Sequence, residues 1–198
     1  GLRLTPRRSF PKTHQREDAM LSERPAANLP LTFRAAARQD LPQIKTVYRK
    51  IVHHMNAQRI EIWDERYPCD FLEEDIRNGR LYLLLHRLDI VSAFALCGEN
   101  AGAAHIDWEH SGAKALYLDR FAVNVRYMGK GIGGYMLSQA CRTARQRGAE
   151  DLRLFVVDCN TPALRLYEKS GFVRRPGVYD EVIDETLVLH EYGYEKKC

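Results

Sequence analysis

The chain has few cysteines and no long apolar run, and each shortage removes a class of protein. Its 198 residues include 5 cysteines, without a Cys-x-x-Cys pair or a Cys/His spacing that suits metal ligands. This pattern argues against a disulfide framework and against a metal site. No segment approaches the roughly 18 consecutive apolar residues of a membrane span, and the first residues lack the apolar core of a secretory signal. We therefore expect a soluble, cytoplasmic protein with no membrane partner.

Charge is unevenly distributed along the chain, whose formal net charge is +4. Residues 1–19 hold five basic residues against Glu17 and Asp18, so a net +3 lies in this segment. It is short and poor in aromatic residues, which argues against nucleic acid as a partner. Residues 1–30 also carry four prolines and show no periodicity, which predicts an extended or poorly ordered basic arm. Residues 31–198 are then expected to form a single globular domain.

Beyond the arm, apolar residues recur with the periods of strands and helices. A first helix is predicted to begin at an Asp40 cap, and a fourth helix is predicted to have Thr161 as its cap and Gly171 as its end. The predicted strands are 31–36, 81–87, 90–97, 115–125, 152–157, 172–179 and 185–192, with a further short strand at 104–108. The predicted helices are 41–55, 69–77, 132–147 and a last one that follows Asn160.

A glycine-rich segment, residues 126–134, joins the predicted strand 115–125 to the predicted helix 132–147. Glycines allow tight turns and close approach of a ligand, and the first turn of a helix presents unpaired amides to an anion. The segment therefore predicts a pyrophosphate-binding loop. Gly129, Gly131 and Gly134 also fit the G-x-G-x-x-G pattern of dinucleotide-binding folds, with Asp158 near the position of the ribose-binding carboxylate. A turn without a ligand remains the simplest alternative.

A second segment, residues 158–172, helps to decide between these interpretations of the glycine-rich loop. Here Asn160, Ala163, Tyr167, Gly171 and Phe172 fit the pattern N-x-x-[AS]-x-x-x-Y-x-x-x-G-F. Together with Arg126, Gly129 and Gly131, which fit [RQ]-x-x-G-x-[GA], these residues make the chain resemble the GNAT superfamily of acyl-coenzyme A-dependent N-acyltransferases. A dinucleotide-binding fold does not require the second pattern.

The resemblance covers Leu31 to about Tyr194 and implies both a fold and an activity. The implied fold is α/β of the α+β type, with a mixed, mostly antiparallel sheet of six to seven strands flanked by about four helices. Its central strands would splay apart between Val123 and Asp158. The implied activity is direct transfer of an acetyl group from acetyl-CoA, as cosubstrate, to the primary amine of a small-molecule or peptide acceptor. A homodimer is compatible with this interpretation.

The resemblance also assigns roles in cofactor binding. The backbone of Phe121, Ala122 and Val123 would pair with pantetheine as an added strand, with the Val123 amide polarising the thioester oxygen. Asn160 would contact the cofactor, or cap its helix, or both. The full set of expected cofactor-binding residues is Phe121, Ala122, Val123, Arg126, Tyr127, Met128, Gly129, Lys130, Gly131, Ile132, Gly133, Asn160, Ala163 and Tyr167.

Three residues are expected to be catalytic. Tyr167 would act as the general acid that protonates the leaving thiolate, although a buried aromatic residue that only packs is the alternative. Strand alternation places Ala115, Tyr117, Asp119, Phe121 and Val123 on one face, so that Tyr117 and Asp119 are expected on the acceptor side. Tyr117 stands where some relatives carry glutamate. A water relay that ends at Asp119, or at Asp107 or Glu109, would then replace a direct base, and a structural role for Asp119 stays open.

Acidic residues in the two segments expected to recruit the acceptor, 58–68 and 174–185, suit a cationic amine, although solvated loops often carry such charges. Two other functions remain. The interpretation as a dinucleotide-binding enzyme is supported only by Gly129, Gly131, Gly134 and Asp158. A non-catalytic acyl-CoA-binding regulatory module is suggested by the missing glutamate at position 117.

Overall fold

The computed structural model describes residues 29–198, so the predicted basic arm lies almost entirely outside the described residues. The strands are β1 (Leu31–Ala35), β2 (Leu81–His86), β3 (Asp89–Cys97), β4 (Ala115–Val123), β5 (Asp151–Val157), β6 (Val173–Arg174), β7 (Tyr179–Val182) and β8 (Val188–Lys197). The helices are α2 (Leu41–Ala57), α3 (Leu72–Arg77), α4 (Ile132–Gln146) and α5 (Thr161–Lys169), and 3₁₀ turns occur at Arg38–Asp40, Cys69–Phe71, Ala103–His105 and Val125–Tyr127.

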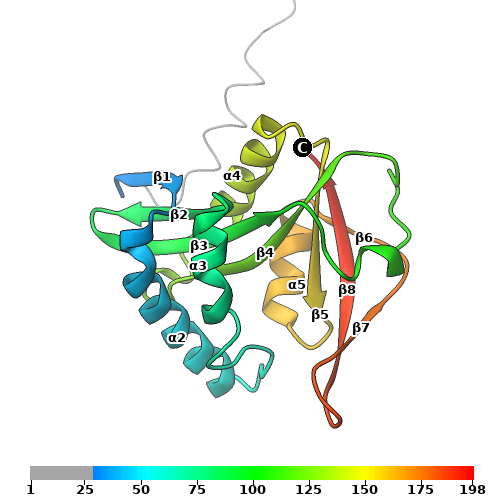
Figure 1. Cartoon of the computed structure of the whole chain (residues 1–198), viewed down its shortest axis with the longest axis horizontal. Coiled ribbons are helices and arrows are strands. Elements are labelled where there is room, and N and C mark those ends of the chain that lie inside the picture. Colours follow the sequence, from blue (N-terminus) through cyan, green and yellow to red (C-terminus); the bar gives the residue numbers. More distant parts are fainter. Residues whose placement is uncertain (1–28) are drawn as a thin grey trace, which may run out of the picture.

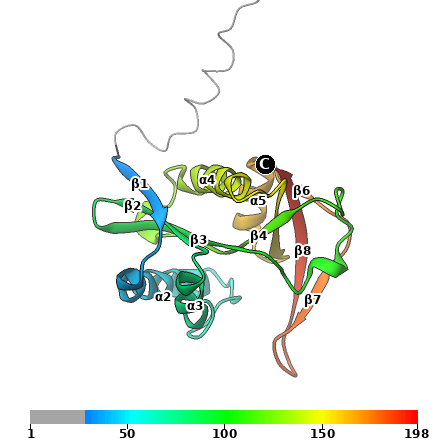
Figure 2. The same ribbon diagram turned by 45° about the horizontal axis from the view of Figure 1, so that its top comes forward.

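The strands form one mixed sheet with the order β1-β2-β3-β4-β5-β8-β6, and β7 pairs with β8. β4 and β5 run parallel to each other, whereas the other described pairs are antiparallel. Helices α2 and α3 cover one face of the sheet, and α4 and α5 cover the other (Figure 2). The predicted fold class is confirmed, with eight strands in place of six to seven because residues 172–192 form β6, β7 and the first half of β8.

Each face of the sheet has its own apolar core. Ile44, Tyr48 and Ile51 of α2 are buried with Leu72 of α3 against one face. Met136, Leu137 and Ala140 of α4 are buried against the other face, together with residues of α5. The spacing of three or four residues in each set is that of an amphipathic helix packed on one side. None of the described helices is long and apolar enough to cross a membrane.

The two central strands separate partway along their length. β4 and β5 pair only from Ala115 to Leu118 and from Asp151 to Leu154, and beyond these residues they diverge, as Figure 1 shows. The predicted splay is therefore present, and it begins before Val123. The edge of β4 beyond Leu118 has no strand paired with it on the β5 side. That edge is available to an extended ligand.

Some predictions of local structure were wrong. The expected strand at 104–108 is absent, and the chain instead forms the 3₁₀ turn Ala103–His105, where the Trp108 Nε1 donates to the Ala103 carbonyl at 2.9 Å. Asp40 is the N-cap residue of α2, as predicted, but its carboxylate makes no capping hydrogen bond to that helix and instead accepts from the Ala37 amide and from Arg34. Helix α5 is capped by Asn160, one residue before the predicted Thr161.

Candidate functional site

A cavity of about 1080 Å³ lies where β4 and β5 diverge. Residues of β4, the glycine loop and the first turn of α4 line its first side. Residues of α5 and the end of β5 line a second side. The rest is lined by the C-terminal half of α2 and the segment after it, by residues 100–101, and by one face of the β7–β8 hairpin. The cavity thus brings together both sequence motifs and both acidic segments, although these lie far apart in the chain.

The glycine loop borders this cavity with unpaired backbone amides. Gly129 and Gly131 have φ angles of 73° and 76°, in the left-handed region that glycine adopts without strain. Within the described residues, the amides of Gly129 through Gly134 donate to no carbonyl or side chain, and the first amide of α4 with a partner is that of Tyr135. These donors and the positive end of the α4 dipole form the anion-binding geometry expected from the sequence.

The loop is held by side chains that the sequence motif did not assign to this task. Asn124 Oδ1 accepts from the Arg126 amide, while its Nδ2 donates to the Ile90 carbonyl at 2.8 Å. Tyr127 is buried, and its hydroxyl donates to Asp89 at 2.9 Å. The bonds to Ile90 and Asp89 join the loop to the start of β3. Arg126 is exposed beside the same Asp89.

Two expected cofactor-binding side chains, Arg126 and Lys130, do not line the cavity, whereas their neighbours in the loop do. Lys130 lies over the Tyr127 ring, with its Nζ 5.5 Å from the ring centroid. Both cations are close enough to the loop to add to its positive potential. Gly133 has a separate packing role, because a Cβ there would lie 2.8 Å from Leu166 of α5. That glycine lets the two motif-bearing helices approach each other.

A bulge in β4 changes which way its side chains face. The register with β3 shifts between Ala93 and Ala95, and Arg120 has a φ angle of 51°. The extra residue reverses the alternation beyond it. Phe121 and Val123 pack with the α4 core, whereas Ala122 packs with the α2 core. The prediction of one face running from Tyr117 through Val123 was therefore wrong.

The bulge is stabilised by a buried ionic network. Arg120 donates to both oxygens of Asp75 of α3 at 2.6 and 2.9 Å, and Arg80 donates to the same carboxylate at 2.6 Å. The Asp75 side chain is completely buried. The Tyr48 hydroxyl donates to the Arg120 carbonyl. These bonds hold Arg120, and with it the bulge, in place, and its guanidinium is paired with Asp75.

Tyr167 lies on α5 at the boundary between the core and the cavity. It is buried, and its ring packs near those of Phe121, Phe172 and Tyr194, with centroids 6.0 to 6.4 Å apart. It also lines the cavity, and its hydroxyl donates to no acceptor within the described residues. Burial raises the pKa of this phenol above its ordinary value, and the negative charge of Asp119 raises it further. The hydroxyl therefore remains protonated throughout the neutral range.

Asn160 and Ala163 line the cavity beside Tyr167. The Asn160 side chain accepts from the Ala163 amide at 3.4 Å, so the capping alternative considered from the sequence applies to this residue. Because Asn160 lies at the cavity wall, its side-chain Nδ2 is available to donate to a ligand. Pro162 occupies the start of the helix, and Gly171, with a φ angle of 84°, follows its end.

Tyr117 is not part of the cavity wall. It is buried in a small cluster with Ile106 and Trp108, and its hydroxyl lies 3.4 Å from Arg153. The physical reason is the position of Tyr117 before the bulge, where β4 is still paired with β5. Asp107 and Glu109 also lie outside the cavity wall. Asp119 is therefore the one residue of this group that faces the cavity.

Asp119 is joined in the cavity by two carboxyl groups of the β7–β8 hairpin, Glu181 and Glu191. Burial raises the pKa of Glu191, and the neighbouring Glu181 carboxyl raises it further. Burial also raises the pKa of Asp119, although the Arg120 charge opposes this shift. Glu181 belongs to an acidic segment singled out from the sequence, whereas Glu191 was missed. Its signal was alternation within the last strand, where Leu189 and Glu191 share one face.

We expect Glu191→Gln to stabilise the protein increasingly as the pH rises. The folded-state pKa of Glu191 is raised, so its carboxyl favours folding below its unfolded pKa, and that contribution is lost as the pH rises through the folded pKa. Glutamine carries no charge at any of these pH values. The melting temperature of the variant relative to wild type should increase by roughly 2–4 °C between about pH 5 and about pH 9.

Glu185→Gln is the matched control, because Glu185 is exposed in the same hairpin and outside the cavity wall. Its melting temperature should follow that of the wild type at both pH values. A Glu191→Gln variant that is less stable than wild type by the same amount at both pH values would contradict the expected burial of a charge.

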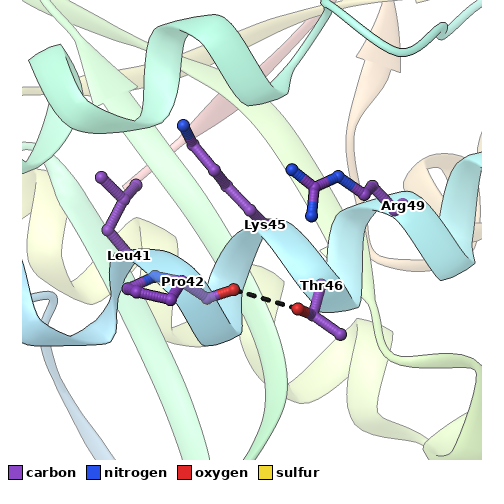
Figure 3. Close-up of a pocket in the computed structure, with 5 residues that line it drawn as sticks. All are labelled: Leu41, Pro42, Lys45, Thr46 and Arg49. Carbon is purple, nitrogen blue, oxygen red and sulfur yellow. Dashed lines mark hydrogen bonds between the residues drawn. The ribbon is translucent and has the colours of Figure 1, made fainter.

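Two other clusters lie away from this cavity. A hollow of about 380 Å³ on α2 is lined by Leu41, Pro42, Lys45, Thr46 and Arg49. There Thr46 donates to the Pro42 carbonyl at 3.1 Å, and the two cations extend from one helical face (Figure 3). This hollow is lined by no carboxyl, thiol or imidazole group, and we assign it no function.

The second cluster consists of Glu109, His110 and Glu195, whose ligand atoms lie within 4.8 Å of one another. Glu195 is paired with Arg153 at 3.0 Å, and Glu109 with Arg175 at 3.3 Å. These ion pairs account for both carboxylates without a metal.

Comparison with known proteins agrees with this geometry. The model of the "Acetyltransferase (GNAT) family" matches residues 48–172. The chain is 46% identical over 44 residues to YwnH of Bacillus subtilis, named as a candidate phosphinothricin acetyltransferase, and 35% identical over 75 residues to streptothricin acetyltransferase of Streptomyces lavendulae. These matches cover 22% and 38% of the chain, but only 27% and 39% of the two relatives.

A solved GNAT-family acetyltransferase of Listeria monocytogenes superposes with a TM-score of 0.63 at 17% identity, covering 85% of this chain and 95% of the other. The Arabidopsis thaliana protein NAA60, solved with a bisubstrate analogue, gives 0.62 at 15% identity, with coverages of 84% and 97%. These likenesses concern the fold. Since the family model spans more than half of the sequence, from α2 to the residue after Gly171, the chain belongs to the acetyltransferase (GNAT) family.

Proposed function

We propose that the protein is an N-acetyltransferase that moves an acetyl group from acetyl-CoA to a primary amine. The observation that carries this proposal is the meeting of the unpaired glycine-loop amides, the open edge of β4 and the Tyr167 hydroxyl in one cavity. A pyrophosphate at the loop and an extended pantetheine along β4 would bring the thioester towards Tyr167. The names of the curated relatives also describe acetyl transfer.

The proposed reaction is a direct transfer. The neutral amine nitrogen attacks the acetyl carbonyl, a carbon–nitrogen bond forms, and the carbon–sulfur bond breaks. The backbone amide of Val123 would stabilise the developing oxyanion. The proton lost by the amine passes through water to Asp119, and the departing thiolate receives a proton from Tyr167. Tyr117 takes no part in this scheme because it lies outside the cavity wall.

Other functions fit the same site less well. A dinucleotide enzyme would require Asp158 to approach the ligand, yet Asp158 is exposed and does not line the cavity. A regulatory module that binds acyl-CoA without turnover was suggested by the missing base at position 117. Asp119, Glu181 and Glu191 supply carboxyl groups in the cavity, so the reason for proposing a module without turnover no longer holds.

Five free cysteines suit the reducing cytoplasm, which we propose as the location.

Calorimetric titration with acetyl-CoA and with NADH tests the proposed cofactor directly. We expect micromolar binding of acetyl-CoA, a free energy of about −8 kcal/mol, and no saturable binding of NADH. Release of free CoA in the presence of primary amines then tests turnover. Binding without turnover on any amine would favour the regulatory module, and preferential binding of NADH would reject both acyl-CoA functions.

Asp119→Asn is expected to lower turnover roughly tenfold at neutral pH, less than the loss of a group that transfers a proton directly. The variant keeps the size of the side chain but cannot accept a proton. Turnover should recover partly as the pH rises, because more of the amine is then neutral in solution. The measurement is kcat/KM against pH for both proteins. Identical profiles for wild type and variant would show that the base lies elsewhere.

A further inference from the structure

The cavity lining is rich in carboxyl groups and poor in cationic side chains. Among the described residues that line the cavity, five carry carboxyl groups: Glu61, Asp64, Asp119, Glu181 and Glu191. Arg120 is the one guanidinium, and the lining includes no lysine. Arg120 donates to both oxygens of the buried Asp75 through its Nε and Nη2, so its charge is already offset by that carboxylate.

Three of these carboxyl groups come from strands that the fold brings together. In the β7–β8 ladder, Glu181 lies opposite Leu189 and Glu191 lies opposite Tyr179. The two glutamates are therefore diagonal neighbours on one face of the hairpin, within reach of each other. Asp119 of β4 is close enough for its charge to raise the pKa of Glu191.

These three groups form no ion pair with any described residue. Asp119 contacts the Cys97 thiol, and the Arg120 charge lies next to it in the chain. Ionised carboxylates that lose water without gaining a counter-ion are costly, which is the physical reason that the pKa values of Asp119 and Glu191 are raised. A cationic ligand would remove that cost.

Aromatic rings also line the cavity. Trp63 packs edge-on against Tyr67, and Phe155 packs edge-on against Tyr179, with ring centroids 6.2 Å apart in each pair. Their faces and edges suit the apolar stem of an alkylamine and the ammonium group itself. We call Asp119, Glu181 and Glu191 the acidic wall. This wall, with aromatic rings in the same cavity and no lysine in the lining, favours a particular charge pattern in the acceptor.

We infer that the acceptor is a cationic amine without a carboxylate of its own, such as a diamine or polyamine. One amine reacts, and a second ammonium group is held by Glu181 and Glu191. This inference rests on the proposed acetyl transfer and names the substrate class of the same site. An amino acid would place its carboxylate against an acidic wall, where like charges repel each other.

Pairs of amines that differ only in a carboxylate test this inference. Cadaverine is lysine without its carboxylate, and putrescine is ornithine without its carboxylate. We expect kcat/KM with acetyl-CoA to be at least about tenfold higher for each diamine than for its amino acid, a difference of about 1.4 kcal/mol. Equal or higher values for lysine and ornithine would overturn the inference while leaving the acetyltransferase function intact.

Glu181→Gln and Glu191→Gln test the named residues. Each substitution should raise KM for cadaverine by about tenfold and reduce the preference over lysine, since each removes one charge from the wall. Glu185→Gln, which is exposed and outside the cavity, should leave both values unchanged. An unchanged preference in both cavity variants would overturn the assignment of these glutamates.

Calorimetry of cadaverine and lysine with the CoA-saturated protein keeps the test independent of catalysis. Tighter binding of cadaverine in a protein that does not turn over would support the charge selectivity and reject the proposed function. Equal binding of the two amines, or no binding of either, would reject the charge selectivity.

Discussion

Gly131→Val should weaken the binding of acetyl-CoA by at least about 100-fold while the protein remains folded, a loss of about 2.8 kcal/mol. Gly131 has a φ angle of 76°, which a β-branched residue adopts only with strain. A Cβ at this position meets no protein atom within 4 Å and would enter the open space next to the unpaired amides. The substitution therefore acts on the ligand side of the loop.

Gly79→Val is a matched control for this substitution. Gly79 has a φ angle of 63°, and a Cβ there also meets nothing within 4 Å, but the residue follows α3 and does not line the cavity. Both variants should lose roughly 1–3 kcal/mol of stability through backbone strain. Only Gly131→Val should lose affinity in calorimetry. A folded Gly131→Val protein with wild-type affinity would remove the loop from the proposed cofactor site.

The parts of the site that sequence predicts well are those built from contiguous residues. The glycine loop and the segment from Asn160 to Phe172 each form a turn with the helix beside it, so their geometry follows from local rules for glycine, caps and helix starts. Even there two caps were open from the sequence, and the structure has Asn160, not Thr161, as the N-cap. Local hydrogen bonding decides such boundaries, and neighbouring polar residues compete for it.

The β4 bulge was not predictable from alternation. One extra residue at Arg120 places Phe121 and Val123 on the α4 side, away from the face that carries Tyr117 and Asp119. Its cause lies far away in the sequence, because the bulge depends on the buried Asp75 of α3. The sequence of β4 alone does not predict the contact between Arg120 and Asp75.

The acidic wall was predicted only in part for the same reason. Asp119, Glu181 and Glu191 share a cavity because β4 diverges from β5 and the β7–β8 hairpin faces the opening. The sequence marks Glu181 within an acidic segment, but Glu191 looks like an ordinary polar residue of the last strand. Alternation places Glu191 on the same face of that strand as Leu189, but the sheet order, with β8 next to β5, is needed to show that this face lines the cavity.

Tyr167→Phe should lower kcat by roughly 100-fold or more, the effect expected when a proton donor is lost from a transfer step. The ring packs against Phe121, Phe172 and Tyr194, and phenylalanine preserves this packing. Since the hydroxyl donates to no described residue, its removal leaves no broken hydrogen bond. Affinity for acetyl-CoA and the melting temperature should therefore remain close to wild type.

Tyr194→Phe separates chemistry from packing, because Tyr194 lies in the same aromatic group but does not line the cavity. Its hydroxyl donates to Glu168 at 2.9 Å, so this variant should lose about 1 kcal/mol of stability and keep its kcat. Single-turnover kinetics with saturating acetyl-CoA and amine make the chemical step visible for all three proteins. If Tyr167→Phe matches wild type in the single-turnover rate, Tyr167 has only a packing role, and the thiolate takes its proton from water.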